Sequence, residues 1–216
     1  MNGVQAGRRR ALQAAISSAA ALALPALASS RRAIARMTEG PFYPPPSWRE
    51  RWSDWDADLT RVPHAGGVAR GEHLGLEGRV LDVDERAIDG ASVEIWQCDA
   101  LGHYRHPSTE PAQRADDAFQ GFGSTHSDAG GRFRFRTIRP VPYPGRTPHI
   151  HVKLRHASFG ELTSQLFVAG DPGNARDFLW RALPAGDRSA LEMRLDDAPR
   201  DSGLRWLARH DLVVPA

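Results

Sequence analysis

The stretch from Arg132 to Leu154, RFRFRTIRPVPYPGRTPHIHVKL, decides the fold. Its first residues alternate strictly between arginine and phenylalanine, which is the period of a strand with one buried face. Prolines follow at positions 140, 142, 144 and 148, and because proline has no backbone N–H, this part cannot form a continuous ladder of strand hydrogen bonds. Alternation resumes at His149-Ile150-His151. The stretch therefore predicts two strands joined by a stiff, proline-rich connection.

Further strands are expected on both sides of this stretch, separated by turns rich in Gly, Pro and Asp. The pattern predicts two hairpins, one joining 73–83 to 91–96 and one joining 125–128 to 132–136 through Ala129-Gly130-Gly131. A polar loop is expected over 99–123 and a helix over 174–183. The other predicted strands are 149–154, 162–168 and 204–214. Short strands at regular intervals predict an all-β chain, a β-sandwich with a few short helices.

The region ahead of these strands has a different composition. Residues 38–46 carry four prolines, and three tryptophans follow by position 55. Prolines disfavour a regular ladder, so we expect an extended arm over 29–72 whose aromatic side chains pack on the body. The sandwich domain is expected to occupy 73–216.

The first residues predict an export signal over 1–28. Arg8, Arg9 and Arg10 precede an alanine-rich apolar run, and Ala26-Leu27-Ala28 fits a small-residue cleavage site. The paired arginines are typical of the twin-arginine route, which implies a periplasmic or extracellular protein. The apolar run is too short and too weakly apolar to predict stable insertion in a membrane.

Charge excludes a nucleic-acid-binding role. The chain has 28 basic and 26 acidic residues, and removing the three arginines of the export signal leaves 25 against 26. A net charge near −1 provides no basic surface for a polyanion. Cys98 is the only cysteine, so no internal disulfide can form, and we expect this side chain to be buried in the core.

Four residues could hold a metal ion: Tyr104, Tyr143, His149 and His151. Residues i and i+2 of a strand point to one face, so both histidines can reach the same ion. Alone the pair is weak evidence, because two histidines on a wet strand face are common. A phenol has a pKa near ~10 and becomes a ligand only when a strongly acidic cation removes its proton. If the four side chains meet, Fe(III) is therefore favoured over Zn²⁺, whose usual ligands are Cys, His and carboxylate.

Several motifs occur in an order that resembles the intradiol ring-cleavage dioxygenases, a family of non-haem ferric enzymes. The resemblance spans roughly residues 38–168. It is carried by the segments Thr-Glu-Gly-Pro-Phe-Tyr (38–43), Leu-Glu-Gly-Arg-Val (76–80), Val-Glu-Ile-Trp-Gln (93–97), Gly-His-Tyr (102–104), Phe-Arg-Phe-Arg-Thr-Ile-Arg-Pro (133–140), Pro-Tyr-Pro (142–144) and His-Ile-His (149–151).

The resemblance implies a function and assigns roles. Tyr104, Tyr143, His149 and His151 correspond to the ligands of Fe(3+), while Arg146 and Gln165 correspond to an active-site arginine and a supporting glutamine. The implied reaction is cleavage of a catechol-type ring with O2, between the two hydroxylated carbons, to a muconate-type dicarboxylate. A homo-oligomer is compatible with the family.

The sequence departs from the family pattern in one place. Only Pro144 to Pro148 separate Tyr143 from His149, where the family usually has a longer insert. Because that insert helps to frame the substrate, its loss predicts a more open site. Two alternatives stay open on sequence alone: a secreted β-sandwich binding module, and an iron-binding member of the family with altered or lost activity.

Overall fold

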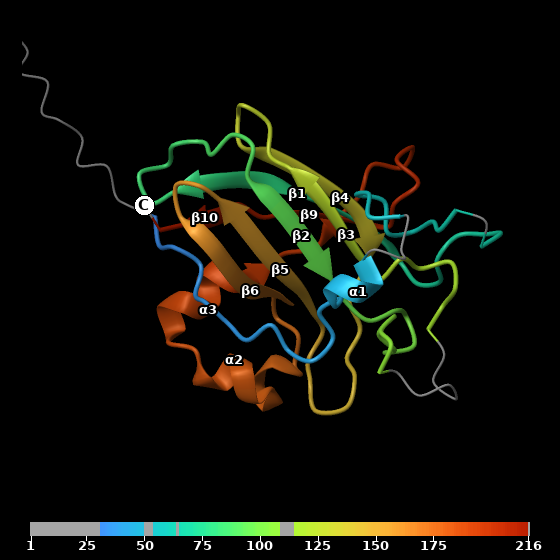
Figure 1. The fold of residues 1–216 in the computed structure, drawn as a ribbon. Helices are drawn as coiled ribbons and strands as arrows, with labels where there is room; N and C mark the ends of the chain where they lie inside the picture. Colours follow the sequence, from blue (N-terminus) through green and yellow to red (C-terminus); the bar gives the residue numbers. More distant parts are fainter. Residues whose placement is uncertain (1–30, 50–53, 64, 109–114, 216) are drawn as a thin grey trace, which may run out of the picture.

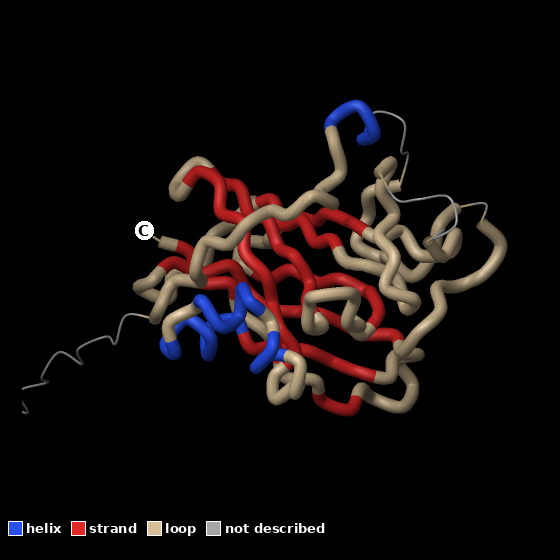
Figure 2. The backbone as a smooth tube through the Cα atoms, turned by 90° about the horizontal axis from the view of Figure 1, so that it is seen from below, coloured by secondary structure: helices blue, strands red, loops and turns tan. Residues whose placement is uncertain are grey.

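The computed structural model describes residues 31–49, 54–63, 65–108 and 115–215. The predicted export signal at 1–28 lies outside these residues. Two five-stranded sheets pack face to face, and helices lie only at the periphery (Figures 1 and 2). The prediction of an all-β sandwich with a few short helices is confirmed. Among the described residues, no helix has the length and apolar character needed to cross a bilayer.

The first sheet is organised around its longest strand, β1 (His73–Asp82). Strand β4 (Arg132–Ile138) pairs antiparallel along one edge of β1. On the other edge, β9 (Trp206–Arg209) and β10 (Leu212–Val214) pair parallel, one after the other. The two-residue strand β8 (Asp196–Asp197) completes the sheet beside β9.

The second sheet has the order β3-β2-β5-β6-β7. Its strands are β3 (Phe122–His126), β2 (Ser92–Trp96), β5 (His149–His156), β6 (Gly160–Val168) and β7 (Glu192–Met193). Ile150, Val152 and Leu154 of β5 point into the core between the sheets, where they are fully buried. By strand alternation, His149, His151 and Lys153 lie on the opposite, outer face of this sheet.

Both predicted hairpins are wrong. Strand β2 does not pair with β1, and β3 does not pair with β4, because each connection carries the chain from one sheet to the other. Period-two alternation identifies a strand with one buried face, but it does not say which strand lies beside it. In a sandwich, a short turn can connect two strands of different sheets as readily as two neighbouring strands of one sheet.

Some element boundaries also differ from those expected. Strand β3 begins at Phe122, inside the predicted loop 99–123, because glycines at 121 and 123 obscure its alternation. The predicted helix 174–183 is interrupted at Asp177, giving the 3-10 turn η2 (Asn174–Arg176) and helix α2 (Phe178–Ala182). Helix α3 (Ala185–Leu191) was not predicted. The expected closing strand 204–214 is two strands, β9 and β10.

The N-terminal region is irregular apart from helix α1 (Pro46–Arg49). Residues 34–37 follow the rim of the body, with Met37 N donating to Thr163 O of β6 at 2.8 Å. Farther along, Ser124 N of β3 donates to Trp55 O, and Arg136 N of β4 donates to Ala57 O, both at 2.8 Å. The segment 55–59 therefore connects edge strands of the two sheets, satisfying backbone groups that an open edge would expose.

Aromatic residues of this region form a second buried cluster, separate from the core between the sheets. Phe42, Tyr43, Trp48 and Trp55 pack against Trp96, Tyr104, Phe122 and Cys98. Cys98 is 1% exposed, as expected for a buried thiol, and burial raises its pKa to about 12. The cluster covers the outer face of the second sheet, which is the face that carries His149 and His151.

Candidate metal centre

The two histidines of β5 are held as neutral imidazoles with their Nε2 atoms facing each other. The Nδ1 atom of His149 lies 2.7 Å from the carbonyl oxygen of Thr147. A carbonyl can only accept, so Nδ1 carries the proton and Nε2 keeps its lone pair. The Nε2 atoms of His149 and His151 are 3.2 Å apart. Two imidazole nitrogens bound side by side to one ion at ~2.1 Å lie roughly 3 Å apart, so this spacing suits shared ligation.

The two tyrosines come from separate segments and meet at the same place. Tyr104 belongs to the loop after β2 and is 5% exposed. Tyr143 lies in a tight turn, closed by Arg146 N donating to its carbonyl at 2.9 Å, and is half-buried. Their ring centroids are 5.5 Å apart at an interplanar angle of 88°.

The four rings form a closed circuit of neighbours. Tyr143 lies 5.5 Å from His149, His149 lies 4.8 Å from His151, and His151 lies 6.2 Å from Tyr104, centroid to centroid. With the 5.5 Å contact between the tyrosines, each ring adjoins two others. All four predicted ligands are therefore brought together by the fold, although they derive from three stretches of chain.

Burial keeps these four side chains uncharged in the protein alone. Burial raises the pKa of Tyr104 well above its usual value, and it also raises the pKa of Tyr143, against the opposing effects of Arg146 and a hydrogen bond with Tyr104. Burial lowers the pKa of His149 to about 4, and it lowers the pKa of His151 well below its usual value. Neutral imidazoles are ready ligands, whereas buried phenols need a strongly acidic cation to become so.

The donor set fits ferric iron better than zinc. Within the described residues, no group of three or more His, Cys, Asp or Glu side chains is placed to hold a metal ion. The usual zinc set is thus absent from that part of the chain, and the two tyrosines are needed to complete a four-donor site. A hard trivalent cation matches two phenolate oxygens and two imidazole nitrogens.

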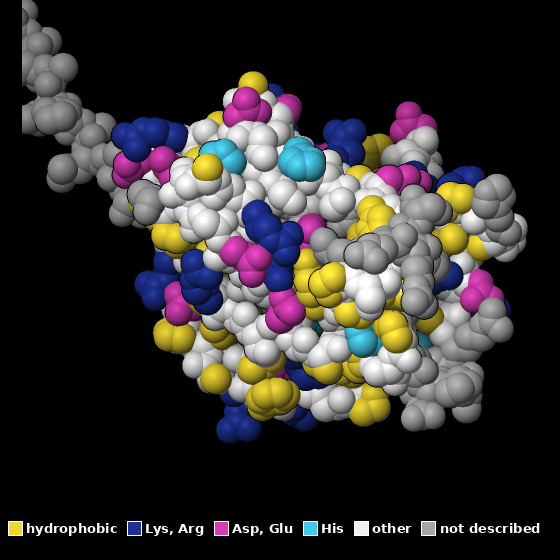
Figure 3. All heavy atoms as spheres, in the orientation of Figure 1, with side chains coloured by type: hydrophobic (Ala, Val, Ile, Leu, Met, Phe, Trp, Pro, Cys, Tyr) yellow, Lys and Arg dark blue, Asp and Glu magenta, His cyan; other side chains and the backbone are white. Residues whose placement is uncertain are grey.

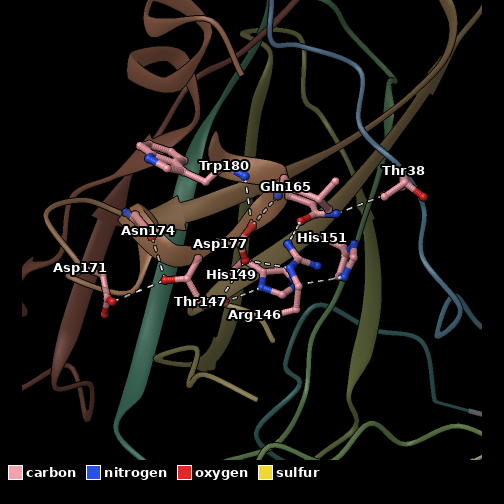
Figure 4. A network of polar contacts seen from close by, with 11 residues as sticks. Thr38, Arg146, Thr147, His149, His151, Gln165, Asp171, Asn174, Asp177 and Trp180 are labelled. Atoms are coloured by element: carbon pink, nitrogen blue, oxygen red, sulfur yellow. Dashed lines mark hydrogen bonds and ion pairs between the residues drawn. The ribbon is translucent and has the colours of Figure 1, made fainter. Parts of the chain in front are cut away.

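Arg146 is fixed beside this site by two side chains (Figure 4). Its Nε donates to Asp177 Oδ2 at 2.8 Å, and its Nη2 donates to Gln165 Oε1 at 2.5 Å. Gln165 is fully buried and lies opposite His151 in the β5–β6 ladder. The structure therefore places both predicted supporting residues, Arg146 and Gln165, next to the four candidate ligands.

Sequence reasoning missed Asp177, which organises this network. Its Oδ2 also accepts from Thr147 N at 3.0 Å, while Oδ1 accepts from Leu179 N and Trp180 N at the start of α2. An aspartate just ahead of a helix is a recognisable N-cap. Nothing in the sequence indicates its second partner, because Arg146 is 31 residues away.

The N-terminal arm forms one wall of the site. Gln165 Nε2 donates to Thr38 O at 3.1 Å, and Phe42 stacks on Tyr104 at 4.4 Å with an interplanar angle of 14°. From the sheet itself, Trp96 stacks on His151 at 4.6 Å and 11°. Trp96, Phe42 and Thr38 contact the candidate ligands or Gln165 without being ligands themselves. No spacing rule predicts these contacts, although all three residues lie in motifs shared with the resembled family.

Comparisons with known proteins identify relatives of this chain. A family model described as "Dioxygenase" matches residues 39–207. The protocatechuate 3,4-dioxygenase beta chain of Burkholderia cepacia is 36% identical over 180 residues, covering 80% of this chain and 77% of that protein. Hydroxyquinol 1,2-dioxygenase of Corynebacterium glutamicum is 33% identical over 126 residues, which are 50% of this chain and only 40% of that protein.

A solved structure is also similar. It is the dioxygenase domain of a dioxygenase carbohydrate-binding protein fusion from Streptomyces sp. SirexAA-E, with a TM-score of 0.65 and 28% sequence identity. The match covers 86% of this chain and 99% of that one. These matches do not favour the alternative of a β-sandwich binding module. They show that the chain belongs to the intradiol ring-cleavage dioxygenase family.

Proposed function

We propose that this protein is a non-haem Fe(III) dioxygenase that cleaves a catechol-type ring between its two hydroxylated carbons. O2 is the co-substrate, and a muconate-type dicarboxylate is the product. The observation that carries the proposal is the closed circuit of Tyr104, Tyr143, His149 and His151, with the two Nε2 atoms 3.2 Å apart. Members of the family use non-haem iron, and the donor set fits that metal.

The ion and the side chains divide the chemistry between them. The four side chains would hold ferric iron, which would supply Lewis acidity toward the catechol oxygens. Tyr104 is almost fully buried and stacked on Phe42, so it serves as a fixed ligand. Tyr143 is half-buried in a turn, so its phenolate oxygen would be within reach of an incoming catechol and would accept a proton from it.

Arg146 provides a fixed positive charge beside the reacting ring. Its side chain is 9% exposed and is paired with the fully buried carboxylate of Asp177. Because Asp177 and Gln165 hold the guanidinium in place, it stabilises developing negative charge without having to reorganise. Gln165 acts here as a positioning residue, since its amide lies between Arg146 and the arm.

Metal content and the visible spectrum test the proposal first. Phenolate bound to Fe(III) absorbs visible light, so we expect a wine-red protein with about one iron per chain. Tyr143→Phe should shift or weaken the band, whereas Tyr43→Phe, a tyrosine that hydrogen-bonds Glu94 outside the circuit, should leave it unchanged. A folded, colourless protein that does not take up iron would contradict the assignment of the ligands.

Oxygen uptake then separates an active enzyme from an inert iron protein. A panel of catechol, protocatechuate, hydroxyquinol and larger catechols should show one O2 consumed per ring cleaved, with a dicarboxylate detected by mass spectrometry. Red protein that consumes no oxygen with any of these compounds would favour the alternative of a family member with lost activity.

We also propose that the protein is exported through the twin-arginine route. The arginines at 8–10, the apolar run and the Ala-Leu-Ala site support this proposal. That route carries folded proteins, which suits a metal inserted before export. Replacing Arg8, Arg9 and Arg10 by lysine should retain the protein in the cytoplasm. Secretion that is unaffected by these changes would argue against the route.

A further inference from the structure

A small cavity opens next to the candidate active site. It has a volume of about 270 Å³, near the lower end of the range for small-molecule pockets. Tyr143, Arg146, Thr147 and Asp177 line it, and the last three are largely buried. Pro142, Pro172 and Arg176 also line it, but they are exposed. The cavity therefore runs from the site residues at its inner end to a mouth formed by η2 and the Tyr143 turn.

The charged side chains of this lining are the groups that can select a substituent. Its prolines and glycines offer no side-chain hydrogen-bond donor, and the hydroxyl of Thr147 already donates to Asn174 Oδ1 at 2.8 Å. Tyr143 is itself a candidate ligand, so selectivity rests on Arg146, Asp171, Arg176 and Asp177. Asp177 is committed to Arg146 and to three backbone amides. Asp171 Oδ1 accepts from Gly173 N at 2.8 Å and lies 3.4 Å from Thr147 Oγ1.

Arg176 is the exception among these charged residues. Its backbone N donates to Gly173 O at 2.9 Å, which fixes the turn, but its guanidinium makes no hydrogen bond or ion pair within the described ranges. An arginine without a carboxylate partner at the mouth of a cavity leaves its planar donors available to an anion.

We propose that Arg176 selects catechols carrying an anionic substituent, such as a carboxylate on a short arm, and that it does so by pairing with that group in this cavity. The inference rests on the proposed function and names its substrate class. A catechol whose hydroxyls reach the Tyr143 and Arg146 end would direct a substituent on the opposite side of its ring toward the mouth. Only residues 144–148 separate Tyr143 from His149, and Gly145 of this segment is an exposed part of the cavity lining.

Matched substrates test the proposal. We would compare 3,4-dihydroxyphenylacetate with 4-ethylcatechol, which has nearly the same size but no charge. The wild-type protein should show a kcat/KM roughly tenfold higher for the acid, as expected for one charge-assisted contact. Arg176→Gln should abolish the preference by raising KM for the acid alone, and Arg176→Lys should restore part of it. Arg181→Gln is the matched control, because Arg181 is also exposed but does not line the cavity.

Binding without turnover separates this inference from the proposed function. Isothermal titration of the holoprotein in the absence of O2 should give a tighter Kd for the acid than for 4-ethylcatechol, and Arg176→Gln should remove the difference. The inference is overturned if the wild-type protein handles both compounds equally, or if Arg176→Gln keeps the preference. Turnover of 4-ethylcatechol in either case would leave the proposed function intact. If neither compound is turned over but the acid still binds more tightly than 4-ethylcatechol, the proposed enzymatic function is contradicted and the proposed anion site is supported.

Discussion

Asp177 is a single residue on which both a helix start and the candidate catalytic arginine depend. Although its burial favours the neutral form, backbone hydrogen bonds from Thr147 and Trp180, together with Arg146, lower its pKa below the usual value. The side chain is therefore a carboxylate at neutral pH. It accepts from groups on both sides, so no isosteric neutral residue can replace it fully.

We predict that Asp177→Asn lowers kcat/KM by a factor of about 10 to 100 while iron content stays unchanged, the range typical of lost supporting contacts at a metal site. Arg146 would lose its anionic partner and its fixed orientation. Steady-state oxygen uptake and iron analysis on the same preparation check this. The control is Asp187→Asn, which alters an acid in the first turn of α3 that pairs with Arg32 and not with Arg146. Normal kcat/KM in Asp177→Asn would show that Gln165 alone positions Arg146.

His210, between β9 and β10, gives a prediction about pH. Burial lowers its pKa, with a smaller contribution from Arg31, against the carbonyls of Ala190 and Glu192 and the carboxylate of Asp211. As pH falls below about 6.5, the unfolded chain takes up a proton before the folded protein does. The stability associated with neutral His210 is therefore present above pH 6.5 and is lost as pH falls toward the folded-state pKa.

His210→Gln should reduce that loss. Glutamine keeps an N–H donor for Ala190 O, which His210 Nε2 contacts at 3.1 Å, but it has no proton to gain. Urea unfolding of the iron-free protein at pH 7.5 and pH 5.0 should show a smaller drop in unfolding free energy for this variant than for wild type. His126→Gln, at the exposed end of β3, should behave as wild type. An unchanged drop in His210→Gln would contradict the argument.

At the scale of elements, the N-terminal arm is attached to the face of β5 that carries the site. Lys153, two residues after His151, forms an ion pair with Glu39, and its Nζ lies 3.9 Å from the centroid of the Tyr43 ring. Its side chain is only 5% exposed. Because Lys153 is the sole lysine of the chain, its reactivity reports directly on whether the arm is docked.

We predict that Phe42→Ala loosens the arm and makes Lys153 label about tenfold faster with an amine-reactive ester. The substitution removes the stack on Tyr104, and such aromatic pairs contribute about 0.5–1.5 kcal/mol beyond buried area. Peptide mass spectrometry after timed labelling measures the rate at Lys153 separately from that at the amino terminus. Phe178→Ala, which removes an exposed ring, should have no effect. Equal labelling in Phe42→Ala would mean that the Glu39 pair and the hydrogen bonds of Met37 and Thr38 hold the arm without the stack.

The elements also show what a sequence can and cannot predict. Strand period correctly placed His149 and His151 on one face, because alternation is a local property of β5. Tyr104 and Tyr143 were candidates on donor chemistry, and family resemblance joined them to the histidines, since no local rule joins a loop to a distant turn. Pairing of β2 and β3 within one sheet could not be read from their turns, because it is decided by which strands share a core face. For the same reason the contact of Asp177 with Arg146 and that of Trp96 with His151 were not predicted, as these partners are set by tertiary packing.

At the scale of the whole molecule, charges of both signs share the surface. On the face shown in Figure 3, basic and acidic side chains are interspersed over the described residues and form no continuous basic field. Among the described residues, several exposed arginines pair with a nearby acid, as Arg139 does with Glu72 and Arg209 with Glu77, both at 3.0 Å. Such exposed pairs contribute little to stability. The stability of the folded protein therefore depends on its buried core and on contacts between segments that are distant in sequence.

A metal ion at the candidate site would join three segments that are distant in sequence: the loop carrying Tyr104, the turn carrying Tyr143, and β5. The unfolded chain cannot assemble these donors, so iron binds the folded state selectively and stabilises it. At a free iron concentration about 100 times Kd, the gain is about 2.7 kcal/mol. For a chain of this size, that gain corresponds to a rise in Tm of roughly 5–10 °C.

We therefore predict that removing iron with a chelator lowers Tm by several degrees, and that returning Fe(III) restores it. Scanning calorimetry of the loaded, stripped and reloaded protein measures the shift. His151→Ala should show a low Tm that no longer responds to iron, because one of the two facing nitrogens is gone. His156→Ala is the matched control, since this histidine of β5 lies outside the site, bonded to Ser158 at 2.8 Å, and it should keep the full response. If His151→Ala gained as much stability from iron as wild type does, the ion would be bound elsewhere, and the four-ring circuit would not be the metal centre.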